Sequence, residues 1–182
     1  VGKMSNTMPG AAENGGCYNH AAGFKAIADC LLGRAEQAWN AFTKVTPGSA
    51  DNPISNSGAE AFSYVNSYSS VAQVYGASGY AWRTGTAGWF CQVLIEHILG
   101  ARRGYDGLVI DPCLPAALPE ARVSRRFRGA TYHIHLVNRP EGGKGPKSIT
   151  LDGQAVEGNV LPLSSSGAEH HVEVRMSPLA PS

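Results

Sequence analysis

The sequence has few charged residues and no long apolar run. Only 16% of its 182 residues are Asp, Glu, Lys or Arg, and the net charge is +1. No basic stretch is long enough to attract nucleic acid or an anionic lipid surface. No window reaches the roughly 18 apolar residues of a membrane span, and the start lacks the charged-then-apolar order of a secretion signal. We therefore expect no nucleic-acid partner, no membrane contact and a cytoplasmic location, with a small neutral or anionic ligand.

Several motifs that carry chemistry are also missing. No CxxC pair occurs, so we interpret the cysteines as reduced and mostly buried, without a disulfide framework or zinc site; they are Cys17, Cys30, Cys91 and Cys113. Neither GxSxG nor the phosphate loop GxxxxGK[ST] is present, and no order of Ser, His and Asp supports nucleophilic catalysis. The chain also opens without methionine, in a stretch typical of the middle of a longer sequence, so we expect a fragment.

The first hundred residues predict helices joined by glycine-rich loops. Apolar residues recur at helical spacing over 20–33, 35–45 and 86–100, and glycines at the ends of these stretches favour termination. A segment rich in Ser, Asn, Gly and Pro over 46–60 predicts a long loop. The serine-rich segment 59–76 is interpreted as a further helix.

The period changes to strict alternation beyond about residue 107. ATYHIHLVN and HHVEVRM alternate as strands do, and SITLDGQAV places an Asp-Gly turn between two β-prone runs. The second half therefore predicts antiparallel β-structure. Helices followed by strands imply two packed units and not an alternating parallel sheet.

Small residues stand where the last predicted helix begins, in TGTAGWF. A helix N-terminus offers unpaired backbone N–H groups and a partial positive charge, both favourable to an anion. Thr84 and Thr86 add hydroxyl groups, while Gly85 and Gly88 let a ligand approach the backbone closely. The segment is suited to hold a phosphate. The alternative is that a threonine only caps the helix and Gly88 only serves helix packing.

A second cluster of polar residues lies in ENGGCYNH. The two glycines allow a tight turn that would bring Glu13, Asn14 and His20 to one loop-to-helix junction. A carboxylate and an amide can pair with sugar hydroxyls, and an imidazole can bind an anion. A purely structural role for His20 is the alternative.

Two further histidine pairs occur in the β-rich half. His133 and His135 share one strand face at a spacing that could bind metal, but no Cys or carboxylate cluster accompanies them, which favours solvent-facing side chains. His170 and His171 point to opposite faces of a strand and receive no role. We expect no metal site and no organic cofactor.

Four segments together resemble a known family. GGCYNHAAGFKAIADCLLGR, WRTGTAGWF, ILGARRGYDGLVIDPCLP and RRFRGATYHI follow the order and rough spacing of the carboxy-terminal part of the inverting glycoside phosphorylases of glycoside hydrolase family 94. This family includes cellobiose, chitobiose, cellobionic acid and laminaribiose phosphorylases. The resemblance implies that residues 1–105 are the last helical hairpins of an (α/α)6 barrel and that residues 106–182 form a small antiparallel β-sandwich domain.

The resemblance also implies an activity. Family members split a β-linked disaccharide with inorganic phosphate as co-substrate, invert the anomeric centre to give an α-sugar 1-phosphate, and need no metal. One carboxylic acid protonates the leaving oxygen, whereas an inverting hydrolase uses a second carboxylate to activate water. None of Asp29, Asp51, Asp106 and Asp111 matches the family's acid. We therefore expect no catalytic residue in this chain and no phosphorolysis by the chain alone.

The family's binding residues map onto five positions. His20, Thr84 and Gly85 match residues that surround the phosphate, Glu13 matches a glutamate that contacts sugar, and Asn66 falls near an acceptor-sugar position that is often glutamine. Expected partners are a β-linked disaccharide, phosphate, and either the missing amino-terminal region of the same enzyme or a homo-oligomer partner. Two alternatives stay open: a non-catalytic carbohydrate-binding or subunit-interaction module derived from the family, and an unrelated anion-binding helical protein.

Overall fold

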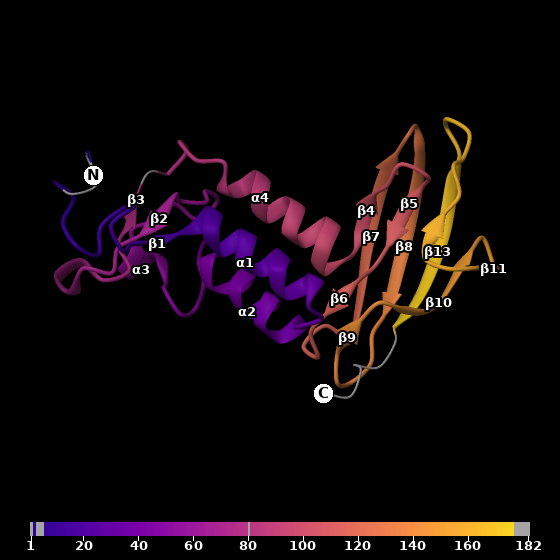
Figure 1. The fold of residues 1–182 in the computed structure, drawn as a ribbon, viewed down its shortest axis with the longest axis horizontal. Coiled ribbons are helices and arrows are strands. Elements are labelled where there is room, and N and C mark those ends of the chain that lie inside the picture. The colour runs from indigo at the N-terminus through magenta and orange to yellow at the C-terminus, as the bar shows by residue number, and fades with distance from the viewer. Residues whose placement is uncertain (1, 3–5, 80, 177–182) are drawn as a thin grey trace. The chain divides into compact units, whose positions relative to one another are not determined.

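A computed structural model describes residues 2, 6–79 and 81–176. It divides into two compact units, the first made of Val1–Ala26 and Asn40–Cys91 and the second of Ile27–Trp39 and Gln92–Ser182. Helices dominate the early part of the chain and strands the later part (Figure 1). The predicted order of α followed by β is therefore confirmed. Within the described residues, no helix is both long and apolar enough to cross a membrane.

Three of the predicted helices form. They are α1 (Asn19–Leu31), α2 (Ala35–Val45) and α4 (Thr86–Gln92), the last continuing as the π-helical segment η3 (Val93–Ile98). The predicted end of the last of these helices falls at Gly100, which has a φ of 73°. A Cβ there would meet the backbone of Asp111 and Pro112, so only glycine fits this turn.

The prediction of a helix over 59–76 is wrong. That segment holds the short strand β2 (Ser67–Tyr68) and the 3₁₀ turn η2 (Ala72–Val74), and β2 pairs antiparallel with β1 (Cys17–Tyr18) and β3 (Ser78–Gly79). The serines explain the difference, because their hydroxyls bind backbone groups that a helix would use. Ser70 Oγ donates to the Gly15 carbonyl at 2.6 Å, and Ser69 Oγ accepts from the Val71 N–H at 3.2 Å. The predicted loop before it contains one short helix, α3 (Ile54–Ser57).

Aromatic side chains fill the helical part of the first unit. The Phe90 ring on α4 lies 5.7 Å from that of Phe42 on α2 and 5.3 Å from that of Tyr64, measured between centroids. The rings of Phe24 on α1 and Trp89 on α4 meet edge to face at 4.9 Å. Such pairs add to the burial of apolar area and hold α1 and α4 together. This packing places the start of α4 beside the start of α1, where the candidate site lies.

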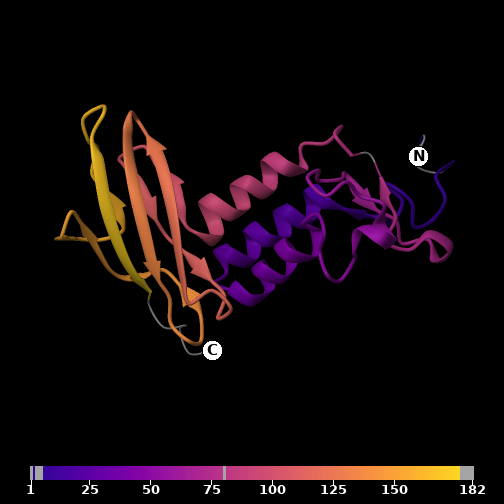
Figure 2. The same ribbon diagram turned by 180° about the vertical axis from the view of Figure 1, so that it is seen from behind.

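The described strands of the second unit form three sheets. The largest has the strand order β11-β10-β13-β8-β7, and it is accompanied by the sheets β12-β5-β4 and β6-β9 (Figures 1 and 2). The strands are β4 (Ala101–Arg103), β5 (Leu108–Ile110), β6 (Cys113–Leu114), β7 (Glu120–Phe127), β8 (Ala130–Val137), β9 (Gly143–Lys144), β10 (Pro146–Leu151), β11 (Gln154–Val156), β12 (Val160–Leu161) and β13 (Glu169–Met176).

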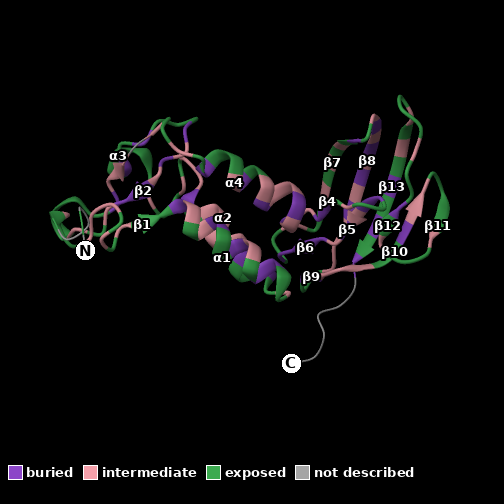
Figure 3. Ribbon diagram, turned by 45° about the horizontal axis from the view of Figure 1, so that its top comes forward, coloured by how far each residue is buried: buried purple, intermediate pink, exposed green. Residues whose placement is uncertain are grey.

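The predicted alternation of β8 is confirmed. Tyr132, Ile134 and Leu136 are buried, while the residues between them are half-buried (Figure 3). The Asp-Gly turn also forms as predicted, joining β10 to β11 with positive φ at both Asp152 and Gly153. The period of two therefore located both the strands and the face that packs into the core.

One strand pair departs from the expected antiparallel arrangement. β13 runs parallel to β8, from Glu169 opposite Thr131 to Arg175 opposite Val137. After β8 the chain pairs β9 with β6, returns to the large sheet as the β10–β11 hairpin, leaves it to pair β12 with β5, and re-enters it as β13 between β10 and β8. This crossover, which alternation within single strands cannot reveal, brings β13 back in the direction of β8.

A buried carboxylate links the helix end to the large sheet. Glu96 on η3, 8% exposed, accepts from Arg125 on β7 at 2.8 Å and from Arg103 on β4 at 3.1 Å.

The prediction that the cysteines are mostly buried is right for Cys30 and Cys113 only, since Cys17 and Cys91 are exposed.

Candidate functional site

The junction between β1 and α1 is fixed by a fully buried asparagine. Asn19 donates through its backbone N–H to the Asn66 carbonyl at 2.9 Å and through Nδ2 to the Val65 carbonyl at 2.9 Å. Its side chain is 0% exposed, so both bonds are shielded from water. Asn19 thereby positions two of the predicted site residues, His20 beside it and Asn66 across from it. Sequence reasoning missed this residue, since an asparagine at a helix start is typical of simple capping.

The Thr84 hydroxyl is the centre of a hydrogen-bonded cluster. Its Oγ1 lies 3.0 Å from His20 Nε2, 3.2 Å from Asn66 Oδ1 and 2.7 Å from the Thr86 hydroxyl. It also accepts from the Thr86 backbone N–H at 3.2 Å. Three residues predicted from the sequence, His20, Asn66 and Thr84, are thus brought together from three separate segments of the first unit.

The donors and acceptors in this cluster constrain one another. Asn66 Oδ1 accepts only, so the single Thr84 proton is directed to it. Thr84 must then accept from His20, which places a proton on His20 Nε2. The His20 Nε2 proton and the Thr84 proton are therefore both engaged inside the cluster. A donor imidazole beside a hydroxyl group is suited to an anionic oxygen.

Gly85 serves the same cluster through its lack of a side chain. A Cβ on Gly85 would stand 3.5 Å from His20 Cε1, in ordinary van der Waals contact, so glycine leaves space beside the ring. The Gly85 carbonyl accepts from the Trp89 N–H at 3.1 Å, which makes Gly85 the residue at which the helix begins. On its other side, the His20 ring lies 5.0 Å from that of Tyr18, measured between centroids. Thr84 therefore contacts both the first N–H of the helix, as a capping residue would, and His20, as a phosphate site would require.

Glu13 stands apart from this cluster. It is exposed, and within the described residues no hydrogen bond joins it to His20, Thr84 or Asn66. Its neighbour Asn14 turns away and donates to the Thr7 carbonyl at 2.7 Å. The sugar-binding role expected for Glu13 and Asn66 stays a prediction.

An unusual backbone conformation precedes the cluster. Trp82 has a φ of 64°, uncommon for a bulky residue, yet its side chain is 71% exposed. Its indole Nε1 donates to Glu60. Strain of this kind costs on the order of 1–3 kcal/mol and collects at functional positions. No pattern in the sequence indicated it.

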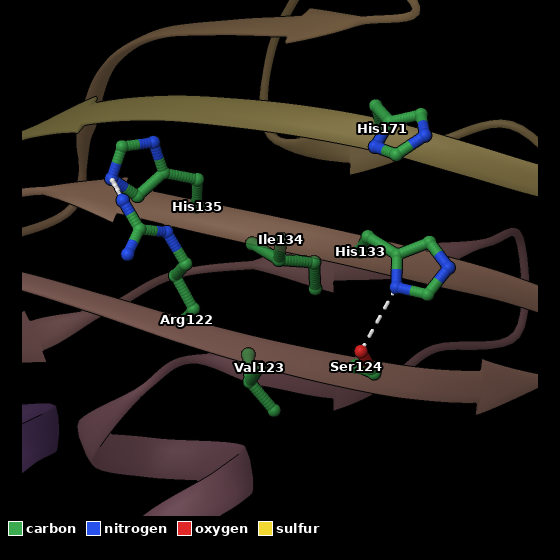
Figure 4. A pocket seen from close by; sticks show the side chains of 7 residues that line it. All are labelled: Arg122, Val123, Ser124, His133, Ile134, His135 and His171. Atoms are coloured by element: carbon green, nitrogen blue, oxygen red, sulfur yellow. Dashed lines mark hydrogen bonds between the residues drawn. The ribbon is translucent and has the colours of Figure 1, made fainter.

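Three histidines of the second unit, His133, His135 and His171, line an open pocket of about 310 Å³ on the large sheet (Figure 4). His133 Nδ1 lies 2.9 Å from Ser124 Oγ, and the His133 and His171 rings stack at 5.4 Å. His135 binds Glu120 at 3.0 Å, and this bond lowers the pKa of Glu120. Among the described residues, no group of three His, Cys, Asp or Glu side chains could hold a metal ion.

Comparison with known proteins identifies the family. A sequence profile described as "Glycosyl hydrolase 94 superfamily, catalytic domain" matches residues 1–100. Solabiose phosphorylase of Paenibacillus borealis is 38% identical over 177 residues, which cover 97% of this chain and 23% of that protein. N,N'-diacetylchitobiose phosphorylase of Vibrio proteolyticus is 34% identical over 175 residues, covering 96% and 22%. Cellobionic acid phosphorylase of Neurospora crassa is 30% identical over 141 residues, covering 75% and 18%.

The chain spans less than a quarter of the length of these relatives. The matched region includes the whole Thr84 cluster, from His20 to Thr86. The family resemblance read from the four sequence segments is confirmed, and the protein belongs to the glycosyl hydrolase 94 superfamily.

Proposed function

We propose that this chain forms part of the phosphate site of an inverting disaccharide phosphorylase. The observation that carries the proposal is the Thr84 cluster, in which a hydroxyl, a donor imidazole and a helix start converge within about one hydrogen-bond length of each other. Phosphate requires several N–H and O–H donors around its oxygens. His20 and Thr84 would supply them by turning their protons from Thr84 and Asn66 to the phosphate, beside the backbone N–H groups at the start of α4.

The proposed substrates follow from the relatives. Those compared above are named as phosphorylases of disaccharides or of a related acid, and we extend that chemistry to the longer protein to which this segment would contribute. Phosphate held by His20 and Thr84 would attack the anomeric carbon of a β-linked disaccharide, giving an α-sugar 1-phosphate. Holding the nucleophile in this way removes the entropic cost of bringing it to the sugar. Glu13 and Asn66 are proposed to contact sugar.

The architecture around the site is part of the same proposal. Residues 1–105 would complete an (α/α)6 barrel and residues 106–182 would form the domain that follows it. Exposed apolar side chains on α1 support a covering partner, since Phe24 is 49% exposed and Leu31 and Leu32 are 56% and 65% exposed. The remainder of the same enzyme or a second copy would cover them. Alone, the chain is expected to be inactive because the general acid lies outside it. The cytoplasmic location and the lack of any cofactor besides phosphate stay predictions.

Calorimetric titration with inorganic phosphate tests the proposal. The wild-type chain should give saturable heat, and His20→Ala should weaken binding at least about tenfold, because it removes a hydrogen bond to a charged group worth about 1.5–3 kcal/mol. His133→Ala, which removes a half-buried histidine on the large sheet, is the matched control and should bind as wild type does. Absence of saturable heat, or equal affinity in His20→Ala, would refute the phosphate site.

A second function is supported by the exposed aromatic residues. Phe62 is 97% exposed, and Trp82 is strained and 71% exposed. These features suit a non-catalytic module that binds carbohydrate or another subunit. That module would bind disaccharide with the same affinity whether phosphate is present or not, which separates it from the phosphorylase proposal in the same calorimeter.

A further inference from the structure

Three polar side chains form a hydrogen-bonded chain at one end of the large sheet. Ser164 Oγ lies 2.7 Å from His170 Nε2, and His170 Nδ1 lies 2.7 Å from Asp152 Oδ2. The residues come from three segments: Asp152 lies in the β10–β11 turn, Ser164 in the loop after β12, and His170 near the start of β13. All three belong to the second unit and take no part in the Thr84 cluster.

The imidazole in this chain is held in a single orientation. Asp152 Oδ1 accepts from the His171 backbone N–H at 2.8 Å, which fixes the carboxylate. The His170 ring stacks on the buried Tyr132 ring at 5.2 Å, and its side chain is 17% exposed. With its Nδ1 proton donated to Asp152, His170 presents Nε2 as the acceptor for the Ser164 proton. This is the tautomer that a general base needs.

The two residues that follow Ser164 in the chain have backbone N–H groups available for a developing oxyanion. Within the described residues, neither Ser165 nor Ser166 uses its backbone N–H in a hydrogen bond. Both groups directly follow Ser164 in the chain. Leu163, which precedes it, is 52% exposed and offers apolar surface for a short acyl chain. Nucleophile, base, orienting carboxylate and free N–H groups are thus adjacent.

From this geometry we infer that Ser164 is a nucleophile that accepts the acyl group of a short-chain ester. Ser164 Oγ forms a bond to the ester carbonyl carbon as its proton moves to His170 Nε2. The bond to the leaving alkoxide then breaks, and the alkoxide takes that proton as it departs as an alcohol. Water, deprotonated in turn by His170, releases the acid and regenerates Ser164. Asp152 is a positioning residue, because it acts through His170.

Labelling with a fluorophosphonate probe tests the inference on the whole chain. The Ser164 oxygen should form a bond to phosphorus with loss of fluoride, and peptide mapping by mass spectrometry should place the adduct on Ser164. Ser148→Ala, which changes an exposed serine on β10 of the same sheet, is the matched control and should be labelled on Ser164 as wild type is. His170→Gln should slow labelling by about 10²–10⁴-fold, the range expected for loss of a general base.

The pH dependence separates a base from a structural contact. The wild-type labelling rate should fall in acid, since a protonated imidazole has no lone pair to accept the Ser164 proton, and the residual rate of His170→Gln should not. Asp152→Asn should slow both labelling and hydrolysis of p-nitrophenyl acetate, since an amide would favour the other tautomer of His170. An unlabelled Ser164, labelling spread over other serines, or an unchanged rate in His170→Gln would overturn the inference. None of these outcomes bears on phosphate binding at Thr84.

Discussion

Replacing Thr84 with valine tests whether its hydroxyl organises the phosphate cluster. Valine keeps the shape of the side chain but removes Oγ1, which has partners on His20, Asn66 and Thr86. The replacement therefore changes hydrogen bonding and leaves packing nearly intact. Thr84→Ser keeps the hydroxyl and loses one methyl group, so it is the matched control.

The expected cost can be worked out partner by partner. His20 and Asn66 are half-buried and can turn to water, so they contribute little to the loss. Thr86 is 0% exposed, and both its hydroxyl and its N–H lose a partner. Each buried group left without a partner costs about 1–3 kcal/mol, so Thr84→Val, which leaves two, should lower the free energy of unfolding by about 2–6 kcal/mol. Thr84→Ser should cost less than about 1 kcal/mol, the value of one buried methyl group.

Thermal unfolding followed by circular dichroism measures the difference. For a chain of this length, about 2–6 kcal/mol corresponds to a midpoint lowered by roughly 4–24 °C in Thr84→Val. Phosphate should raise the midpoint of the wild type and of Thr84→Ser but not that of Thr84→Val, since a ligand stabilises only the state that binds it. Equal midpoints for the valine and serine variants would show that the Thr84 hydroxyl does not hold the hydrogen-bonded cluster together.

Three further predictions concern the second unit. Glu96→Gln should destabilise it by about 3 kcal/mol in urea titrations, because Arg125 would keep a largely buried charge without its carboxylate. Gly100→Ala should cost about 3 kcal/mol by the same measurement, since alanine is strained at a φ of 73° and its methyl group would meet backbone. The hydrogen bond from His170, followed by the His171 N–H, lowers the pKa of Asp152, so this carboxylate stabilises the fold above the unfolded-state pKa of about 4 and loses that effect as the pH falls through the lower folded pKa. The stability difference between wild type and Asp152→Asn should therefore be present at about pH 6 and diminish in strong acid; a difference independent of pH would contradict this assignment.

Local patterns predicted most of the regular structure. Helical spacing located α1, α2 and α4, and strict alternation located β8, because burial on one face leaves a direct trace in the sequence. The helix predicted over 59–76 does not form because serines in this segment bind distant backbone groups such as the Gly15 carbonyl. No local pattern in the sequence contains such contacts. The parallel pairing of β13 with β8 was not predicted for the same reason, since it depends on the route of the chain between the strands.

The candidate site was predictable only in part. His20 and Thr84 stood out through their residue types and the family resemblance, and the structure brings them together. Asn19 did not stand out, because its importance comes from burial and from two carbonyl groups in the segment before β2. The Ser164, His170 and Asp152 chain was also invisible, since its members are separated by unrelated residues and meet only when β13 joins the large sheet.

The measurement that tests the phosphate site most directly is a titration followed at the histidine side chains by ¹H–¹⁵N NMR. As inorganic phosphate is added, the His20 Nε2 resonance should shift and saturate, because the Nε2 proton is proposed to turn from Thr84 to a phosphate oxygen. The resonances of His133 and His171, on the outer face of the large sheet, should stay in place. A His20 resonance that does not move, or a shift confined to the histidines of the sheet, would contradict the assignment of phosphate to the Thr84 cluster.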